Sequence, residues 1–278
     1  MPLVKLLCYN LGDLDMLRFN IVAAGLLSIA GFASAASAAD LPARVYTKAP
    51  PVVAPVYNWG GFYIGLNAGG GSSHNCWNLT ANAAGAIPAA PSEGCSNATG
   101  GLVGGQVGYR WQATNWVFGL EAQGDWANLK GSNASLTGTF GGLPFLNQTK
   151  TDAIGLFTGQ VGYAWNNWLG YVKGGAAVTH DRYNGVTQFA VGTIPAGFAF
   201  DGASETRWGG AVGVGVEYGF APNWSVALEY DHLFMGGSSN NIITPAGVFD
   251  RTENVRQNID MGTVRLNYTF GGPIVARY

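Results

Sequence analysis

The chain is poor in charged residues and lacks long apolar runs. Only 11% of its 278 residues are charged, whereas soluble domains carry about 25%. The net charge is −2 and no Lys/Arg-rich run occurs, which argues against nucleic acid as a partner. No apolar stretch beyond the N-terminal region is long enough for a transmembrane helix. With 47% hydrophobic residues, the chain must hide its apolar surface in a soluble β-sandwich or a membrane β-barrel.

Cysteine is scarce as well. The chain has three, Cys8, Cys76 and Cys95, and Cys8 precedes an expected signal peptide. The remaining pair in an exported chain indicates a disulfide between Cys76 and Cys95, with two free thiols as the alternative. No CxxC spacing occurs, which disfavours a zinc site.

Glycine, in contrast, is abundant, with 43 residues, roughly twice its usual share. Glycine is unfavourable inside helices because it loses the most backbone entropy on folding and offers no side chain to pack. A helical bundle is therefore not expected.

The N-terminal region reads as a targeting segment. From Met16, one positive charge, an apolar stretch over 21–32 and an Ala/Ser run over 33–39 predict a secretory signal cut before Asp40, with an N-terminal anchor as the alternative. Residues 1–15 fit no such pattern, so 1–39 is interpreted as a spurious extension plus a signal peptide. Residues 40–58 are Pro-rich and predict an extended leader, and 59–278 predict the folded domain.

A strict alternation decides between sandwich and barrel. Over residues 207–220, the even positions are apolar or glycine and the odd positions are small or charged. This period of two predicts a strand with one apolar face. Aromatic residues flank β-branched ones on that face, which is typical of a strand facing lipid. A sandwich strand would carry bulky polar residues, rather than glycine, on its other face.

The alternation recurs as a hairpin repeat. Three segments share a strand, a tight turn ending in Asn-Trp, and a second strand, with tryptophans at 116, 168 and 224. Strands are predicted at 60–71, 100–111, 116–128, 151–165, 168–180, 205–220, 224–235 and 255–270. Long connections are predicted at 72–99, 129–150, 181–204 and 236–254. The phase of the alternation breaks within 255–262, which predicts a β-bulge there.

These features predict an all-β fold: a closed, antiparallel, eight-stranded transmembrane β-barrel with up-and-down meander topology. Lipid cannot satisfy backbone N–H and C=O groups, so a membrane sheet must close on itself. Short turns at one end and long connections at the other are typical of outer-membrane barrels. The predicted aromatic girdle comprises Trp116, Trp168, Trp208, Trp224, Tyr218, Phe220, Tyr268 and Phe270.

The combination resembles a known family. It includes the small-residue cut before Asp40-Leu41-Pro42, the Trp-Gly-Gly-Phe-Tyr-Ile-Gly opening at Trp59, the Gly-Tyr…Asn-Trp hairpins and the Val-Arg-Leu-Asn-Tyr-Thr-Phe end at Phe270. Over about residues 40–278 the chain resembles the outer membrane immunogenic, porin-like proteins of alpha-proteobacteria, which are related to OmpA-type barrels. Either Phe270 or Tyr278 would end the barrel-insertion signal.

The resemblance implies a location and partners. It places the barrel in the Gram-negative outer membrane, with a periplasmic leader and extracellular loops. Outer-membrane lipid, lipopolysaccharide and, during insertion, the barrel-assembly machinery are the expected partners. The implied role is structural or host-facing, some members resemble haemin binders, and no catalytic residue is implied.

Six charged residues are predicted to face the lumen. Glu121, Lys173 and Glu229 each follow a hairpin tryptophan by five residues, and Arg110, Glu217 and Arg265 share their inward parity. An eight-stranded barrel holds only its own side chains, and buried charges need partners. The sequence therefore predicts a lumenal charge network that acts as a structural plug. Alternatives are a gate, or a catalytic carboxylate pair that no sugar could reach in a packed lumen.

The histidines support no firm site. His74, His180 and His232 lie near predicted loop ends, which leaves a haem or metal site open, although their spacing does not demand one. No serine near them stands in a nucleophile motif. The sequence therefore predicts a non-enzymatic, surface-exposed structural barrel without cofactor. The alternative is a narrow porin or a barrel that takes up a small ligand such as haemin.

Overall fold

The computed structural model describes residues 57–271, and these form nine β-strands. They are β1 (Gly61–Asn82), β2 (Gly85–Ala86), β3 (Ser92–Ala113), β4 (Trp116–Phe140), β5 (Leu143–Trp165), β6 (Trp168–Thr187), β7 (Ala199–Ala221), β8 (Trp224–Ile243) and β9 (Phe249–Thr269). The predicted signal peptide, most of the predicted leader and Tyr278 lie outside the described residues. Within 57–271, no helix is long and apolar enough to cross a membrane.

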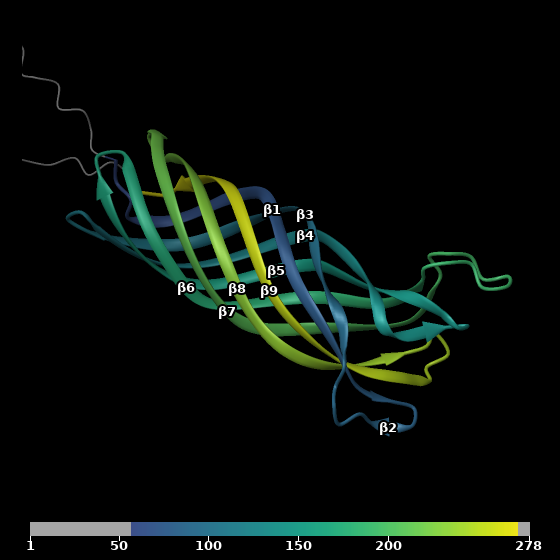
Figure 1. Ribbon diagram of the computed structural model, residues 1–278. Helices are drawn as coiled ribbons and strands as arrows, with labels where there is room; N and C mark the ends of the chain where they lie inside the picture. The colour runs from purple at the N-terminus through teal and green to yellow at the C-terminus, as the bar shows by residue number, and fades with distance from the viewer. Residues whose placement is uncertain (1–56, 272–278) are drawn as a thin grey trace, which may run out of the picture. The chain divides into compact units, whose positions relative to one another are not determined.

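The strands form an antiparallel meander that closes into a ring. The order is β2-β1-β3-β4-β5-β6-β7-β8-β9, and β1 also pairs with β9 (Figure 1). The structure thus has nine strands where the sequence predicts eight. The additional strand, β2, has two residues and pairs only with the end of β1. Such a short strand carries no alternation by which the sequence could reveal it.

Three tight turns join strands at one end of the ring, called here the short-turn end. Thr114, Asn166 and Asn223 adopt positive φ angles of 56°, 55° and 69° in these turns, a conformation that asparagine tolerates better than most residues. The asparagine before each hairpin tryptophan also donates its side-chain amide to a carbonyl of the next strand. These bonds are Asn115 to Ala164 (2.9 Å), Asn167 to Gly219 (3.0 Å) and Asn223 to Thr269 (2.7 Å). The Asn-Trp repeat therefore links neighbouring hairpins.

At the opposite end, called the long-connection end, the strands continue well past their predicted limits. Apart from β2 they have 20 to 25 residues, whereas about 9–11 suffice to cross a membrane when tilted. The predicted long loops are consequently wrong in extent, because strands fill most of them. The remaining connections are 83–91, 141–142, 188–198 and 244–248. The prediction ended each strand at the point where its outward-facing side chains become polar, whereas the backbone pairing continues beyond that point.

The predicted bulge in β9 is also wrong. Residues 255–262 pair with β1 without interruption, from Trp77–Val255 to Gly70–Gly262. The irregularity lies on β8, where Met235 is an extra residue between Phe234 and Gly236. In β9 the apolar side chains of Val255, Ile259 and Met261 are buried inside the ring. The alternation therefore only appears to break. In the first half of β9 the apolar side chains face the interior, whereas in the second half they face outward.

An apolar belt surrounds the ring on its outside. On β4, every second side chain from Trp116 to Trp126 faces outward, with Phe118 and Leu120 between them. Of the eight residues predicted as a girdle, seven lie toward the short-turn end, and Trp208 lies at the other edge of the belt. The belt thus covers about the strand length that crosses a hydrocarbon core.

Tyr57 and Trp59 close the interior at the short-turn end. Their rings lie 4.4 Å apart and pack inside the ring of strands against Val117, Leu169 and Tyr171. Tyr57 belongs to the stretch predicted as an extended leader, and its side chain is buried. Residues just before β1 therefore form part of the core.

Candidate functional site: the interior of the strand ring

Two groups of charged side chains lie inside the ring, next to Tyr57 and Trp59 at the short-turn end. In the first, Arg110 on β3 and Glu217 on β7 form an ion pair of 2.8 Å. Because β3 and β7 are not neighbours in the ring, this ion pair crosses the interior. Glu217 also accepts a hydrogen bond of 2.9 Å from Asn267. Both ion-paired side chains are fully buried.

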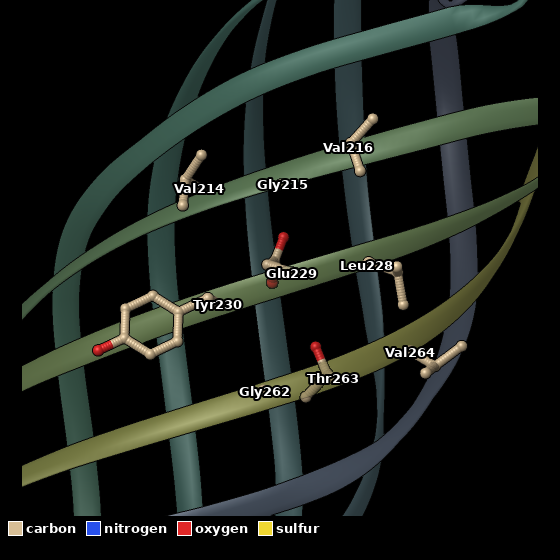
Figure 2. A pocket seen from close by; sticks show the side chains of 9 residues that line it. All are labelled: Val214, Gly215, Val216, Leu228, Glu229, Tyr230, Gly262, Thr263 and Val264. Carbon is tan, nitrogen blue, oxygen red and sulfur yellow. The ribbon is translucent and has the colours of Figure 1, made fainter.

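Lys173 on β6 stands at the centre of the second group. Its Nζ lies 2.6 Å from Glu229, 3.2 Å from Asp231 and 3.5 Å from Glu121. Arg265 on β9 makes ion pairs with both Glu121 and Glu229. Figure 2 shows Glu229 on β8 between Leu228 and Tyr230, whose side chains lie on the apolar outer wall.

Tyrosines join the two groups. The Arg110 guanidinium lies 4.3 Å from the centre of the Tyr63 ring, and the Tyr63 hydroxyl donates a hydrogen bond of 2.6 Å to Glu121. The Tyr171 hydroxyl likewise donates a hydrogen bond of 2.6 Å to Glu229. The structure thus brings all six predicted lumenal residues into one connected network. The sequence analysis did not predict a role for the tyrosines or for Asp231. The signal available for Asp231 was its position two residues after Glu229, which puts it on the same inward face of β8.

An apolar layer follows the network toward the long-connection end. On β4, Ala127 and Leu129 lie beyond Glu121, and on β8 Leu233 lies beyond Asp231. All members are buried and come from seven strands: Ala98, Leu102, Ala127, Leu129, Ile154, Leu156, Ala177, Ala211, Leu233, Met235, Ile259 and Met261. The sequence reading did not identify this layer. At this level of the interior it places hydrocarbon side chains on seven of the eight strands of the ring.

Polar groups return beyond this layer. Gln257 donates to Asp181 at 3.0 Å, and farther along Trp77 and Tyr183 pack edge to face at 5.3 Å. Near the strand ends, Arg251 pairs with Asp201 and, at 3.0 Å, with Glu253. These groups lie outside the apolar belt. Burial raises the pKa of Asp201 to about 6 and that of Glu253 to about 7, against the opposing effect of Arg251.

The arrangement agrees with comparisons to known proteins. Residues 24–270 match the family model described as "Outer membrane protein beta-barrel domain". The chain belongs to this family. This outer-membrane β-barrel protein is 31% identical over 259 residues to the 31 kDa outer-membrane immunogenic protein of Brucella melitensis, covering 88% of this chain and 98% of the relative. The resemblance to outer membrane immunogenic proteins is thereby confirmed.

The chain is also similar to proteins at lower sequence identity. The 25 kDa outer-membrane immunogenic protein of Brucella canis is 26% identical over 242 residues, which are 87% of this chain and 94% of that protein. Among solved structures, the outer membrane protease OmpT of Escherichia coli has a TM-score of 0.43 at 10% identity, over 76% of this chain and 97% of its own. Ail of Yersinia pestis has a TM-score of 0.31 at 12% identity, over 75% of this chain and 99% of Ail.

The outer wall of this β-barrel protein holds Cys76, Cys95 and the three histidines. Cys76 and Cys95 form a disulfide between directly opposed positions of β1 and β3, as predicted. His74, His180 and His232 lie on β1, β6 and β8 with their side chains on the outer face, so the ring holds them apart. His74 does lie close to both cysteine sulfurs. Those sulfurs are bonded to each other and offer no thiolate to a metal.

Proposed function

We propose that the protein is a non-conducting, non-enzymatic structural barrel of eight membrane-spanning strands with a lumen filled by side chains. The short turns face the periplasm, and the long-connection end is displayed outside the cell. The apolar layer across the interior is the observation that carries this proposal. An ion crossing the barrel would have to lose its hydration among leucine, isoleucine and methionine side chains.

The charge network supports the same function. Its carboxylates are held by Lys173, Arg110 and Arg265 and by tyrosine hydroxyls, so they are structural partners rather than free acids or bases. The side chains around Glu121 and Glu229 are buried on all sides. This burial keeps the carboxylates away from solvent, which argues against catalysis.

A narrow pore is the second candidate, and one observation favours it. Four carboxylates, counting Asp231, face three cations in the network, and neither oxygen of Asp231 forms a hydrogen bond within the described residues. Such a group could attract a cation or a proton. In this alternative, rearranged ion pairs around Lys173 open the path.

Single-channel recording separates the two candidates. The mature chain, residues 40–278, is refolded and inserted into a planar lipid bilayer. We expect no stable conductance from the wild type or from Lys173→Ala, because the apolar layer remains in both. The Leu129→Gly/Leu156→Gly variant, which opens the layer and leaves the network intact, should show more frequent openings. Stable wild-type conductance, or conductance that appears with Lys173→Ala alone, would favour the pore.

A further inference from the structure

Three cationic side chains lie in a row on the outer wall. Lys130 on β4 is directly opposite Lys150 on β5, and Lys150 is directly opposite Arg182 on β6. Directly opposed residues have Cβ atoms about 4.5–5.5 Å apart. All three face away from the interior, and Lys130 and Arg182 are exposed. We call Lys130, Lys150 and Arg182 the cationic row.

The row carries uncompensated positive charge. Asp152 pairs with Lys150 and, at 2.8 Å, with Arg182. Within residues 57–271, no carboxylate forms an ion pair with Lys130. Like charges in directly opposed positions destabilise a sheet. One carboxylate for three cations therefore leaves a site that an anion from outside would stabilise.

The row is also a local feature of the outer wall. Among residues 57–271, the Lys and Arg residues with outward-facing side chains are Lys130, Lys150, Arg182 and Arg256. Arg256 lies on β9, three strands away from β6 in one direction around the ring and three from β4 in the other. The cations are therefore concentrated on β4–β6.

The row lies just beyond the apolar belt. On β4, Trp126 marks the edge of the belt and Lys130 follows four residues later, about 13 Å farther along the strand. On β6, Arg182 follows Val178 by four residues, and Val178 is opposite Trp208 at the same edge. Because strands in such barrels tilt, the row stands roughly at the depth of lipid headgroups.

We propose that the cationic row binds a phosphate group of the lipid A portion of lipopolysaccharide in the outer leaflet. The inference rests on the proposed function for the orientation that puts this end of the barrel outside the cell. Lys130, Lys150 and Arg182 supply charge-assisted hydrogen bonds to the phosphate oxygens. Trp126, below Lys130 on the same face, contacts the upper part of the acyl chains. The apolar belt and the row thus bind the two ends of one amphiphilic lipid.

Native mass spectrometry of the mature chain in detergent tests the proposal. The probes are bisphosphorylated lipid A and lipid A whose phosphates have been removed. Each lysine near an anionic lipid surface contributes a factor of about five in affinity. We therefore expect Lys130→Gln/Lys150→Gln to weaken binding of bisphosphorylated lipid A by roughly 25-fold. The matched control Arg256→Gln removes an outward cation outside the row and should leave binding unchanged.

Three results would overturn the proposal. One is equal binding of the two lipid A forms by the wild type, and another is an equal loss with Arg256→Gln. The third is full competition by inorganic phosphate at matched phosphate concentration, which would assign the row to a free anion. All the substituted side chains lie on the outer wall, and unchanged heat-modifiable migration would confirm folding. A conductance recorded from the wild type would contradict the proposed function while leaving the lipid A result valid.

Discussion

Replacing Lys173 offers a quantitative test of the buried network. The Lys173 side chain is 1% exposed and faces Glu121, Glu229 and Asp231. Removing one partner of a buried ion pair leaves an uncompensated charge and typically costs about 3–5 kcal/mol. We expect Lys173→Met, which keeps the length and apolar stem of the side chain, to lose stability in this range. The loss would therefore come from charge rather than from a cavity.

A second substitution separates the charge effect further. Asp231 is buried, and Lys173 is its ion-pair partner among the described residues. Lys173→Met/Asp231→Asn should therefore recover about 1–3 kcal/mol relative to the sum of the single losses. Guanidinium unfolding of the refolded mature chain in detergent, followed by tryptophan fluorescence, measures both values. A loss below about 1 kcal/mol for Lys173→Met, or strict additivity in the double variant, would refute the reasoning.

Two further predictions concern the long-connection end. Cys76→Ser/Cys95→Ser should lower the unfolding free energy by about 2–4 kcal/mol, as should dithiothreitol acting on the wild type, whereas dithiothreitol should leave the double variant unchanged. Burial raises the pKa of Glu253 to about 7 from the ordinary glutamate value of about 4.5, so the folded protein binds more protons than the unfolded chain between these pH values. Stability should therefore fall as pH rises from about 4.5 to 7. Guanidinium midpoints should show a smaller fall for Glu253→Gln, and equal falls would contradict the assignment.

The membrane-facing half of the fold was predictable from the sequence. The alternation in 116–126 and 207–220 fixes which side chains face outward, and the same parity placed Glu121, Lys173 and Arg265 inside the ring. The family resemblance agreed with this reading. Where lipid is on one side of a strand, a period of two is a strong signal.

The other half was not predictable by the same rule. Beyond the belt the outer wall becomes polar, and apolar side chains such as Val255 and Ile259 face the interior instead. They therefore appear out of phase in the sequence, although the backbone pairing continues unchanged. The apolar layer was missed for the same reason, because Leu129 and Leu233 were not read as inward-facing. Long-range hydrogen bonds such as Asn115 to Ala164 depend on register between hairpins, which no local pattern specifies.

Thiol accessibility at two neighbouring positions tests the closed interior most directly. Ala127 belongs to the apolar layer and is 8% exposed, whereas Asn128 faces outward and is exposed. The variants Ala127→Cys and Asn128→Cys are treated with a charged, water-soluble methanethiosulfonate reagent in lipid vesicles. The native disulfide leaves no other thiol in residues 57–271. We predict rapid labelling at position 128 and none at 127 until the protein is denatured. Comparable labelling of both in the folded protein would show that water fills the interior, which would contradict a closed barrel.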